Sequence, residues 1–451
     1  SVSVTMALIA RDRTGKGQRI EVPMHSAMFS AIGRHLVKLY DIDPPDLFAW
    51  PRNIMAHQYQ CADGRYIQSQ GMYQVFVGSL MTAAGRPEWI EELENLYGVE
   101  VSQETISLWK DRFEKMFLER TAKEWEDDIA AARGVGTVCK TIDEWLVHPH
   151  ALESNMVSEI DDARYGRMKQ PGVQVRLRGT PGAIQGRAPI LGEHTAEILA
   201  EANAPGRAVT FQDSGENIMG ALEGIRVLDL CIVLAGPTCG RTLGEFGAEV
   251  IKIEAPSGDP TRRFNPLAPG ESRIFLSRNR GKHSLPLRLS HPEARPVTDQ
   301  LLNWADVVLI NFRPGLEKEL GLAPHDLLLV HPRLVIASVT AFGKRGTDAG
   351  LSGMDIVLQA RSGLMAANGR MLEGRPASGD PVSADYMCAM CLSFGVASAL
   401  LRRERTGRGG IVDVSLMQAA MTLANNQLVR SEEQDRPVHE AALKNLAAQR
   451  S

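Results

Sequence analysis

The chain has 451 residues, of which 44% are hydrophobic and 23% are charged, and its formal net charge is −4. This composition is typical of a globular protein with a large core and lacks the basic patches of a nucleic-acid-binding protein. Glycine, serine or charged residues interrupt the apolar runs, so no membrane-spanning segment is predicted. Six cysteines are too few for a disulfide framework and predict a reducing, cytoplasmic location.

One segment of the sequence occurs twice, 392 residues apart. Ala7–Met28 and Ala399–Ala420 align without a gap and are identical at nine positions. This spacing is far too long for a solenoid or propeller repeat, and it is about the length of a complete enzyme subunit. The chain is therefore predicted to be a segment of a tandem-fused protein that begins late in one copy and ends late in the next.

The first 200 residues combine helical and extended patterns. A helix is predicted at Met6–Arg13, followed by a strand at Gln18–Pro23 and a helix at Met24–Tyr40. A turn is predicted at Ala62–Gly64. From Met72 to Arg133 apolar residues recur at helical spacing. The apolar positions of this stretch are Leu108, Phe113, Met116, Phe117 and Trp125.

Beyond residue 219, short apolar strands alternate with helices. The expected strands are Ile225–Leu230, Glu249–Ile253, Val307–Asn311 and Leu334–Thr340, and helical patterns between them include Thr238–Phe246 and Glu293–Trp304. Apolar strands that alternate with helices form a parallel sheet covered on both faces. The predicted fold class is therefore α/β, a doubly wound, Rossmann-like parallel sheet accompanied by a smaller α+β domain.

Two strand ends carry residues suited to a nucleotide. Parallel sheets bind ligands at the carboxyl ends of their strands. Leu234–Pro237 offers small residues and a helix N-terminus that favour a phosphate, or it is a tight turn. Asn311, Phe312 and Arg313 could stack an adenine and pair a phosphate, or form a capped turn. No G-x-G-x-x-G follows a strand, which argues against a nicotinamide dehydrogenase.

Asp385 stands at the start of an almost wholly apolar helix predicted at Tyr386–Leu401. The positive field of a helix N-terminus would keep a carboxylate ionised, and an ionised carboxylate can attack an activated acyl group. The alternative is a simple N-cap. Cys388 and Cys391 in the same helix are interpreted as buried thiols, and no metal site is predicted.

The motifs of both parts occur together in a recognisable order. They are Leu222–Leu230, Leu234–Pro237, Phe246–Glu254, Asn279–Lys282, Ala305–Val308, Asn311–Gly315 and Arg405–Gly409, preceded by Ala62–Gly64 and Ala188–Thr195. On these motifs residues 221–424 resemble the N-terminal half of the class III CoA-transferases, the family of formyl-CoA transferase, carnitine CoA-transferase and α-methylacyl-CoA racemase. Residues 4–201 resemble its C-terminal half.

The resemblance implies an organisation for the chain. Residues 1–205 would be the C-terminal half of a first copy, with its small domain at about 50–180. A linker at 206–219 would lead into the Rossmann-like CoA-binding half of a second copy at 220–425, followed by a polar tail at 426–451. Because subunits of the family interlock in pairs, a homodimer or an intramolecular pairing of fused copies is expected.

The resemblance also implies a function. An aspartate at the position of Asp385 attacks an acyl-CoA thioester, forms an anhydride and then an aspartyl-CoA thioester, and passes CoA to a carboxylate acceptor. The partners would be acyl-CoA and a small carboxylic acid, with CoA as substrate and no permanently bound cofactor. The CoA contacts implied are Leu234, Ala235, Leu287, Arg288, Leu289, Ser290, Asn311, Phe312, Arg313, Thr340 and Ala341.

Three departures from the family pattern bear on this function. Met354 stands where the racemases carry a proton-transferring histidine, and methionine cannot move a proton. Glu319 replaces an arginine, and the neighbouring Lys318 would substitute for it in phosphate pairing. The glycine-rich loop of some transferases has no evident counterpart. A racemase of the same family, disfavoured by Met354, and a non-catalytic CoA-binding fragment remain the alternatives to a transferase.

Overall fold

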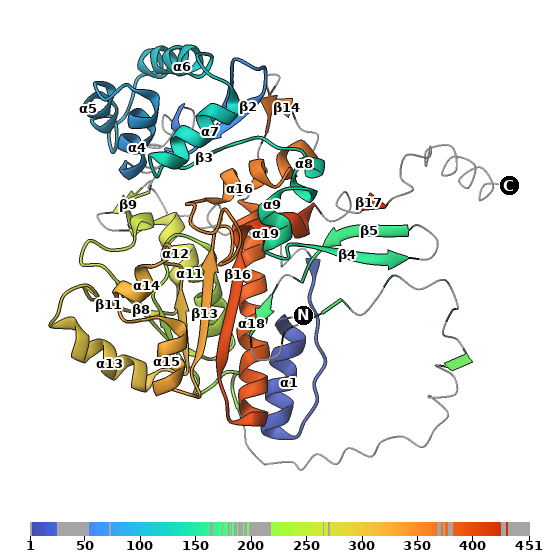
Figure 1. Cartoon of the computed structure of the whole chain (residues 1–451). Helices are drawn as coiled ribbons and strands as arrows, with labels where there is room; N and C mark the ends of the chain where they lie inside the picture. The colour runs from blue at the N-terminus through green and yellow to red at the C-terminus, as the bar shows by residue number, and fades with distance from the viewer. Residues whose placement is uncertain are drawn as a thin grey trace.

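The structure is a computed structural model and is shown in Figure 1. It describes residues 2–24, 54–71, 74–162, 166–173, 175–178, 218–264, 266–268, 271–367, 371–372, 375–377, 382–424 and 430–431, with isolated positions between 181 and 197. Nearly all of the predicted helix Met24–Tyr40, of the linker at 206–219 and of the polar tail lies outside these residues.

A seven-stranded sheet forms the centre of the second part of the chain. Its strands in spatial order are β11 (His283–Pro286), β8 (Glu249–Glu254), β7 (Arg226–Asp229), β12 (Val307–Ile310), β13 (Val335–Thr340), β16 (Gly410–Ser415) and β6 (Arg176–Leu177). The first six are parallel, and β6 pairs antiparallel with β16. The four predicted strands are confirmed, whereas β11, β16 and β6 were not predicted. The edge strand β6 is contributed by the N-terminal part of the chain.

Helices cover both faces of this sheet, as a doubly wound fold requires (Figure 1). Val307 and Leu309 of β12 point into a core shared with α11 (Ala235–Glu245) and α18 (Ser383–Thr406). Val308 and Ile310 point into a second core with α13 (Ala294–Trp304) and α15 (Pro324–Val330). This alternation along one strand confirms the α/β parallel sheet and explains why the strand sequences are apolar throughout.

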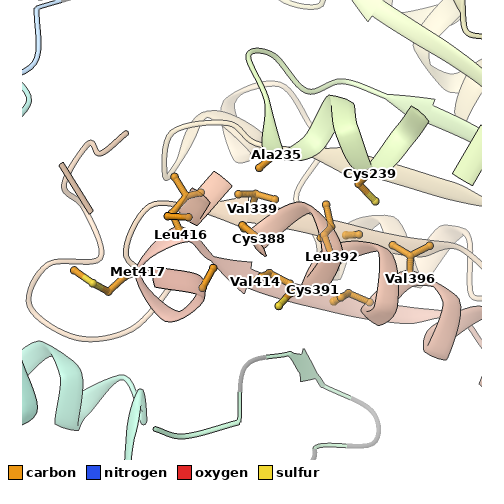
Figure 2. Packing of buried hydrophobic residues seen from close by; sticks show 14 of the residues in the cluster. Ala235, Cys239, Val339, Cys388, Cys391, Leu392, Val396, Val414, Leu416 and Met417 are labelled. Carbon is orange, nitrogen blue, oxygen red and sulfur yellow. The ribbon is translucent and has the colours of Figure 1, made fainter. Parts of the chain in front are cut away.

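Helix α18 is apolar because it lies within the core. Figure 2 shows Cys388, Leu392 and Val396 packed beside Val339 of β13 and Val414 of β16. Among the described residues it is the one helix whose length and composition would allow it to cross a membrane, and 67% of its most apolar window is buried, as in a core helix. The helix is longer than the predicted Tyr386–Leu401, since it spans Ser383–Thr406. Gly407 caps its C-terminus in the left-handed region, with a φ of 71°.

The two copies of the repeated segment meet in the structure. The first lies in α1 (Val2–Thr14), which packs beside α18, and Asp12 pairs with Arg405 at 2.7 Å (Figure 1). The predicted strand Gln18–Pro23 is wrong, because these residues are exposed and join none of the described sheets. Its counterpart in the repeat forms β16, which pairs with β13 along its whole length. A strand needs such a partner for its backbone groups.

A smaller unit precedes the sheet domain. Three antiparallel strands, β1 (Gln58–Gln60), β2 (Tyr66–Ser69) and β3 (Gly136–Val138), pack with α4 (Val75–Ala84), α5 (Trp89–Glu94), α6 (Gln103–Phe117) and α7 (Ala122–Ala131). The predicted turn and helical stretch are confirmed, with Phe113, Met116, Phe117 and Trp125 in the core. Leu108 is the exception at 49% exposed, because it lies on the outer face of α6.

The remaining elements surround these two units. They are α8 (Ile142–Leu146), α9 (Pro149–Glu153), β4 (Val157–Asp162), β5 (Gly166–Pro171), η2 (Pro260–Arg263), β9 (Pro266–Ala268), β10 (Glu271–Ser272), α12 (Arg273–Asn279), α14 (Leu316–Glu319), α16 (Asp355–Arg361), α17 (Leu364–Ala367), β14 (Met371–Leu372), β15 (Arg375–Pro376), α19 (Leu416–Leu423) and β17 (Arg430–Ser431).

A buried ionic network joins the smaller unit to the sheet domain. Arg361, at the end of α16, donates to Glu126 of α7 at 2.8 Å and to Asp348 at 2.5 Å. Lys140 adds a further contact to Glu126 at 3.4 Å. Burial acts to raise the pKa of Glu126, but Arg361 and Lys140 outweigh it and hold that pKa below its ordinary value. The smaller unit is therefore attached to α16, the helix that begins at Asp355.

Candidate active site

The loops after β7 and β12 meet where the strand order reverses. The chain runs from β7 outward to β8 and β11, and then returns to β12 on the other side of β7. Asn311 joins the two loops, because its side chain accepts from Ile232 N at 3.0 Å and donates to Ile232 O at 2.8 Å. Such a reversal creates a ligand crevice in open α/β sheets. The side-chain amide of Asn311 thus joins the two loops that form the crevice, which agrees with the capped-turn interpretation.

A cavity of about 260 Å³ opens at the carboxyl ends of β12 and β13. Its lining residues are Ile310, Phe312, Pro314, Glu317, Ser338, Val339, Thr340, Lys344, Ala349 and Gly350. The fold therefore brings together Phe312 and Thr340, which lie far apart in sequence. Lys344 is the cation in this lining and pairs with Asp413 at 3.0 Å. Lys318 and Glu319 are exposed and do not line the cavity.

The other residues predicted to contact CoA lie around this edge of the sheet without sharing the cavity. Arg313 is exposed beside it, and Ala341 follows β13, where its carbonyl accepts from Met417 N at 3.0 Å. Residues 287–290 follow β11 at the far end of the same edge. Leu234 and Ala235 are only 2% and 3% exposed, because they lie at the start of α11 beneath the surface.

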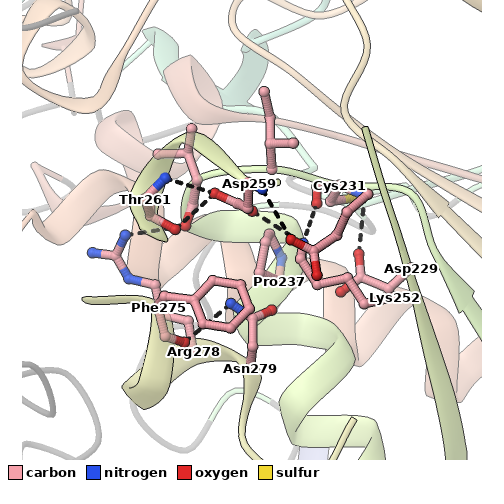
Figure 3. Close-up of polar contacts among 12 residues, drawn as sticks. Asp229, Cys231, Pro237, Lys252, Asp259, Thr261, Phe275, Arg278 and Asn279 are labelled. Atoms are coloured by element: carbon pink, nitrogen blue, oxygen red, sulfur yellow. Dashed lines mark hydrogen bonds and ion pairs between the residues drawn. The ribbon is translucent and has the colours of Figure 1, made fainter. Parts of the chain in front are cut away.

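The bend at residues 231–237 is held by three buried cations from three different segments. Lys252 donates to Cys231 O at 2.7 Å, Arg278 to Val233 O at 3.0 Å, and Lys282 to Pro237 O at 2.7 Å. Figure 3 shows Lys252 between Cys231 and Asp259. Lysines of this kind are tolerated inside a protein only when paired. Their acids are Asp259, 3.0 Å from Lys252, and Asp229, 2.7 Å from Lys282.

Gly236 has a packing role that the sequence did not reveal. A Cβ at this position would lie 2.3 Å from the Cys231 sulfur, so only glycine lets α11 close against the bend. The small residues of Leu234–Pro237 were predicted to admit a ligand to the backbone. In the structure, Gly236 allows close contact between the bend and α11.

Asp385 lies beside a second carboxylate, Asp355. Asp355 is the first residue of α16 and is 4% exposed. One of its oxygens accepts from Asp385 N at 2.8 Å, and the other accepts from the Gln359 side chain. Asp385 is partly accessible in the first turn of α18. Asp355 was missed as a functional residue, although it directly follows Met354, which the sequence had marked.

The pKa values of Asp355 and Asp385 are both raised above their ordinary values. Burial, followed by the negative charge of Asp355, raises the pKa of Asp385 to about 8, and the positive charge of Arg278 opposes this rise. Burial also raises the pKa of Asp355 to about 6. The prediction that the helix N-terminus keeps Asp385 ionised is therefore wrong near neutral pH, because desolvation and the neighbouring carboxylate outweigh the helix field. Neighbouring carboxyl groups with raised pKa values make this pair a candidate functional site.

The sequence matches the family described as CoA-transferase family III over residues 1–195 and 222–449. The chain belongs to this family. Its sheet and smaller unit are those of the class III CoA-transferase fold.

Three relatives of this family place the chain in context. The beta subunit of succinyl-CoA–L-malate CoA-transferase from Chloroflexus aurantiacus is 40% identical over 44% of this chain and 49% of its own. The CoA-transferase/lyase DddD from a Marinomonas species is 26% identical over 92% of this chain and 55% of its own. A crystal structure of Rv3272 from Mycobacterium tuberculosis is 38% identical over 47% of this chain and 59% of its own, with a TM-score of 0.44. The chain thus spans about half the length of the curated relatives it matches.

The smaller unit of this CoA-transferase family member reaches the segment next to the carboxylate pair. Gln70, at the end of β2, is buried and contacts the Met354 sulfur through its Nε2 at 3.5 Å. Met354 is the residue that the resemblance predicts in place of the racemase histidine. A thioether accepts no proton near neutral pH, so the site offers no base at residue 354. Residues from both parts of the chain therefore border the region around Asp355.

Proposed function

We propose that this chain is a CoA-transferase that moves CoA from an acyl-CoA donor to a carboxylate acceptor through Asp385. The observation that carries the proposal is the Asp355–Asp385 pair, which lies at two helix N-termini in a member of CoA-transferase family III. With a pKa of about 8, Asp385 is mainly protonated at neutral pH, and its ionised fraction, which grows as the pH rises, would supply the nucleophile. Racemisation is not favoured, because Met354 cannot act as its base.

The reaction consists of exchanges between a thioester and an anhydride. The Asp385 carboxylate attacks the thioester carbonyl of the donor, which forms a mixed anhydride and releases CoA thiolate. The thiolate attacks the aspartyl carbonyl, which forms an aspartyl-CoA thioester and releases the donor acid as a carboxylate. The acceptor carboxylate then attacks this thioester, and the released thiolate opens the second anhydride to give the new acyl-CoA and Asp385. CoA is a substrate throughout and needs no resident cofactor.

We propose that the CoA nucleotide binds in the cavity at the ends of β12 and β13. Phe312 supplies an aromatic face for the adenine, and Lys344 supplies a cation for a phosphate. Lys344 pairs with Asp413 at 3.0 Å, so a bound phosphate would share this cation with the carboxylate. Leu287–Ser290 and Arg313, at the same edge of the sheet, remain predicted CoA contacts.

Covalent trapping tests the proposed function. The purified chain is incubated with a panel of acyl-CoAs, treated with hydroxylamine and digested, and the peptide that carries Asp385 is weighed by mass spectrometry. We expect a hydroxamate on that peptide with at least one donor, because hydroxylamine cleaves aspartyl anhydrides and thioesters. CoA binding without any adduct would favour a non-catalytic CoA-binding fragment.

Replacement of Asp355 by asparagine is expected to shift adduct formation to lower pH. The negative charge of Asp355 raises the pKa of Asp385, so its removal lowers that pKa below about 8 and ionises the nucleophile earlier. Asparagine keeps an oxygen that can accept from Asp385 N. The rate of hydroxamate formation is measured between pH 5 and 9, with Asp299→Asn, which alters a half-buried carboxylate on α13, as the control. A midpoint that stays in place or moves upward would contradict the coupling.

Replacement of Phe312 by alanine is expected to weaken CoA binding roughly tenfold, because stacking of a base on an aromatic ring contributes about 1–3 kcal/mol. Calorimetric titration with CoA measures the Kd. The exposed Leu329→Ala on α15 serves as the control and should leave the Kd unchanged. An unchanged Kd in Phe312→Ala would remove the adenine from this cavity.

We also infer that the chain spans the junction between two fused copies. Two observations support this arrangement: the same family is matched before and after residues 196–221, and the repeated helices α1 and α18 lie side by side. Glu126 of the first part pairs with Arg361 of the second part at 2.8 Å, so the two parts contact each other through a buried ion pair. The donor and acceptor acids belong to this proposal as classes only, an acyl-CoA and a small carboxylic acid.

A further inference from the structure

The loop at residues 341–350 forms one side of the cavity proposed for CoA. It follows β13, and its residues Lys344, Ala349 and Gly350 belong to the lining of that cavity. The loop contains turns and bends but neither helix nor strand. Its backbone groups therefore need partners on other elements to fix the position of the lining.

The element that supplies these partners is α9, which belongs to the first part of the chain. The His150 side chain is fully buried there, and both of its ring nitrogens bond the backbone of the loop. Nε2 pairs with Phe342 O at 2.7 Å, and Nδ1 accepts from Asp348 N at 2.9 Å. Glu153, one turn further along α9, accepts from Thr347 N at 3.0 Å. The first part of the chain thus holds the loop at three points.

The two partners of His150 fix its protonation state. A carbonyl only accepts and a backbone N–H only donates, so Nε2 carries the hydrogen and Nδ1 carries the lone pair. A doubly protonated ring would direct a second hydrogen at the N–H of Asp348 and would lose that bond. His150 can therefore hold the loop by both nitrogens only as a neutral imidazole.

The loop is also shaped to close over this imidazole. A Cβ at residue 346 would lie 2.6 Å from His150 Nδ1, and Gly346 has a φ of 87°, in the left-handed region that favours glycine. The Phe342 ring meets the imidazole edge to face, with 5.9 Å between the ring centroids. The loop therefore packs on the same ring that it bonds.

We propose that His150 is a positioning residue for the CoA cavity, because its neutral imidazole holds the 341–350 loop against α9 and thereby keeps Lys344 at the cavity. This inference rests on the proposed binding of CoA in that cavity. His150 is not part of the lining and acts through the loop backbone. The cavity of the second part thus depends on a side chain of the first part.

Charged groups on each neighbouring element act on His150. Asp348 of the loop and Glu153 of α9 favour its protonation, whereas Arg361 of α16 opposes it. His148 at the N-cap of α9 is neutral at pH 7, because burial lowers its pKa to about 4. Burial is the largest effect on His150 and holds its pKa below the ordinary value.

Acid should therefore open the loop. When the loop opens, water reaches His150 and the ring regains the ordinary pKa of a histidine. Opening becomes more favourable as the pH falls below that ordinary value, by up to about tenfold per pH unit, until the pH reaches the pKa of the closed form. Affinity for CoA should fall over the same range of pH.

The test compares two substitutions of His150 in the full chain. His150→Gln keeps a donor and an acceptor but does not titrate, and His150→Leu removes both hydrogen bonds. His283→Gln is the matched control, because His283 is exposed at the amino end of β11, away from the cavity. Mass spectrometry follows hydrogen exchange in the peptide that carries Thr347 and Asp348, and calorimetric titration gives the Kd of CoA. Both are measured between about pH 5.5 and 8, which brackets the ordinary pKa of histidine.

We expect the protection of the loop peptide, divided by that of His150→Gln at the same pH, to fall with acid in the unaltered chain and in His283→Gln. The Kd of CoA, treated in the same way, should rise over the same range. This comparison cancels the intrinsic pH dependence of exchange and the titration of CoA itself. At pH 8, His150→Leu should lower loop protection and CoA affinity roughly tenfold each, since two hydrogen bonds are lost. Exchange in α6 should stay unchanged in every variant.

The outcomes separate the two proposals. An acid dependence that persists in His150→Gln overturns the role of His150. A loss of protection that α6 shares also overturns it, because the effect would then reflect global stability. An unchanged Kd in His150→Leu with an opened loop overturns the link between loop and cavity. If His150→Leu fails to fold, the comparison of the unaltered chain with His150→Gln decides. Absence of CoA binding in the unaltered chain contradicts the proposed CoA site, and loop exchange still shows whether His150 holds the loop.

Discussion

Replacement of Asp385 by asparagine is expected to abolish the covalent adduct and to lower the rate of CoA transfer by at least about 10⁴-fold, the scale seen when a group essential to covalent catalysis is removed. The reason is chemical. The amide of asparagine cannot attack the thioester to form an anhydride, so the cycle that regenerates the free acid cannot begin. The exchange of acid for amide nearly preserves shape. It also removes a buried carboxyl group whose ionised form the charge of Asp355 disfavours. The fold should therefore be retained.

The controls for this variant isolate chemistry from binding. Asp326→Asn, an exposed carboxylate on α15, should transfer CoA at the rate of the unaltered chain. The Kd of CoA and the thermal unfolding midpoint should be similar in Asp385→Asn and in the unaltered protein. Transfer that persists in Asp385→Asn would show that another group carries the acyl or CoA intermediate.

Replacement of Arg361 by methionine is expected to lower the free energy of unfolding by about 3–5 kcal/mol, which is the usual cost of removing one partner from a buried ion pair. Arg361 bridges Glu126 and Asp348 inside the protein, so the change leaves Asp348 without this cation and leaves Glu126 with the more distant Lys140. Because Glu126 belongs to the smaller unit and Arg361 to α16, the variant should also weaken the attachment of the smaller unit to α16. Urea unfolding followed by circular dichroism measures the loss.

The pH dependence of this variant identifies the cause. The folded-state pKa of Glu126 is held below its ordinary value, so the stability it contributes is present above that ordinary value and is lost as the pH falls through the folded-state pKa. Arg361→Met should flatten this acid dependence. Arg65→Met, which breaks the exposed pair with Glu144, should cost no more than about 1 kcal/mol. Equal losses in the two variants would mean that the buried network contributes no more than a surface pair.

The sequence alone predicted the features that depend on local pattern. Apolar runs such as Val307–Ile310 indicated buried parallel strands, and the periodicity around Phe113 and Trp125 indicated the helices of the smaller unit. The motifs around Leu234, Asn311 and Asp385 predicted the family, which the family match over both parts confirms. These predictions succeed because strand, helix and motif are properties of residues that are neighbours along the chain.

Predictions that depended on distant partners failed or stayed incomplete. Gln18–Pro23 has the pattern of a strand, yet it pairs with no described strand, whereas its repeat forms β16 beside β13. Asp385 was expected to be a lone ionised carboxylate, and the fold instead sets Asp355 beside it. The cations at Lys252, Arg278 and Lys282 were not recognised as supports of one bend.

What the sequence by itself determined about this protein is its class of fold, its family and the identity of the candidate nucleophile. The tertiary structure alone decided how that nucleophile titrates and what holds it. A pKa depends on burial and on charges within a few ångströms, and these are set by packing between α16, α18 and α12. Asp355 and Asp385 are separated by 30 residues, and Arg278 precedes them by 77 and 107 residues, so only the folded chain brings their charges together.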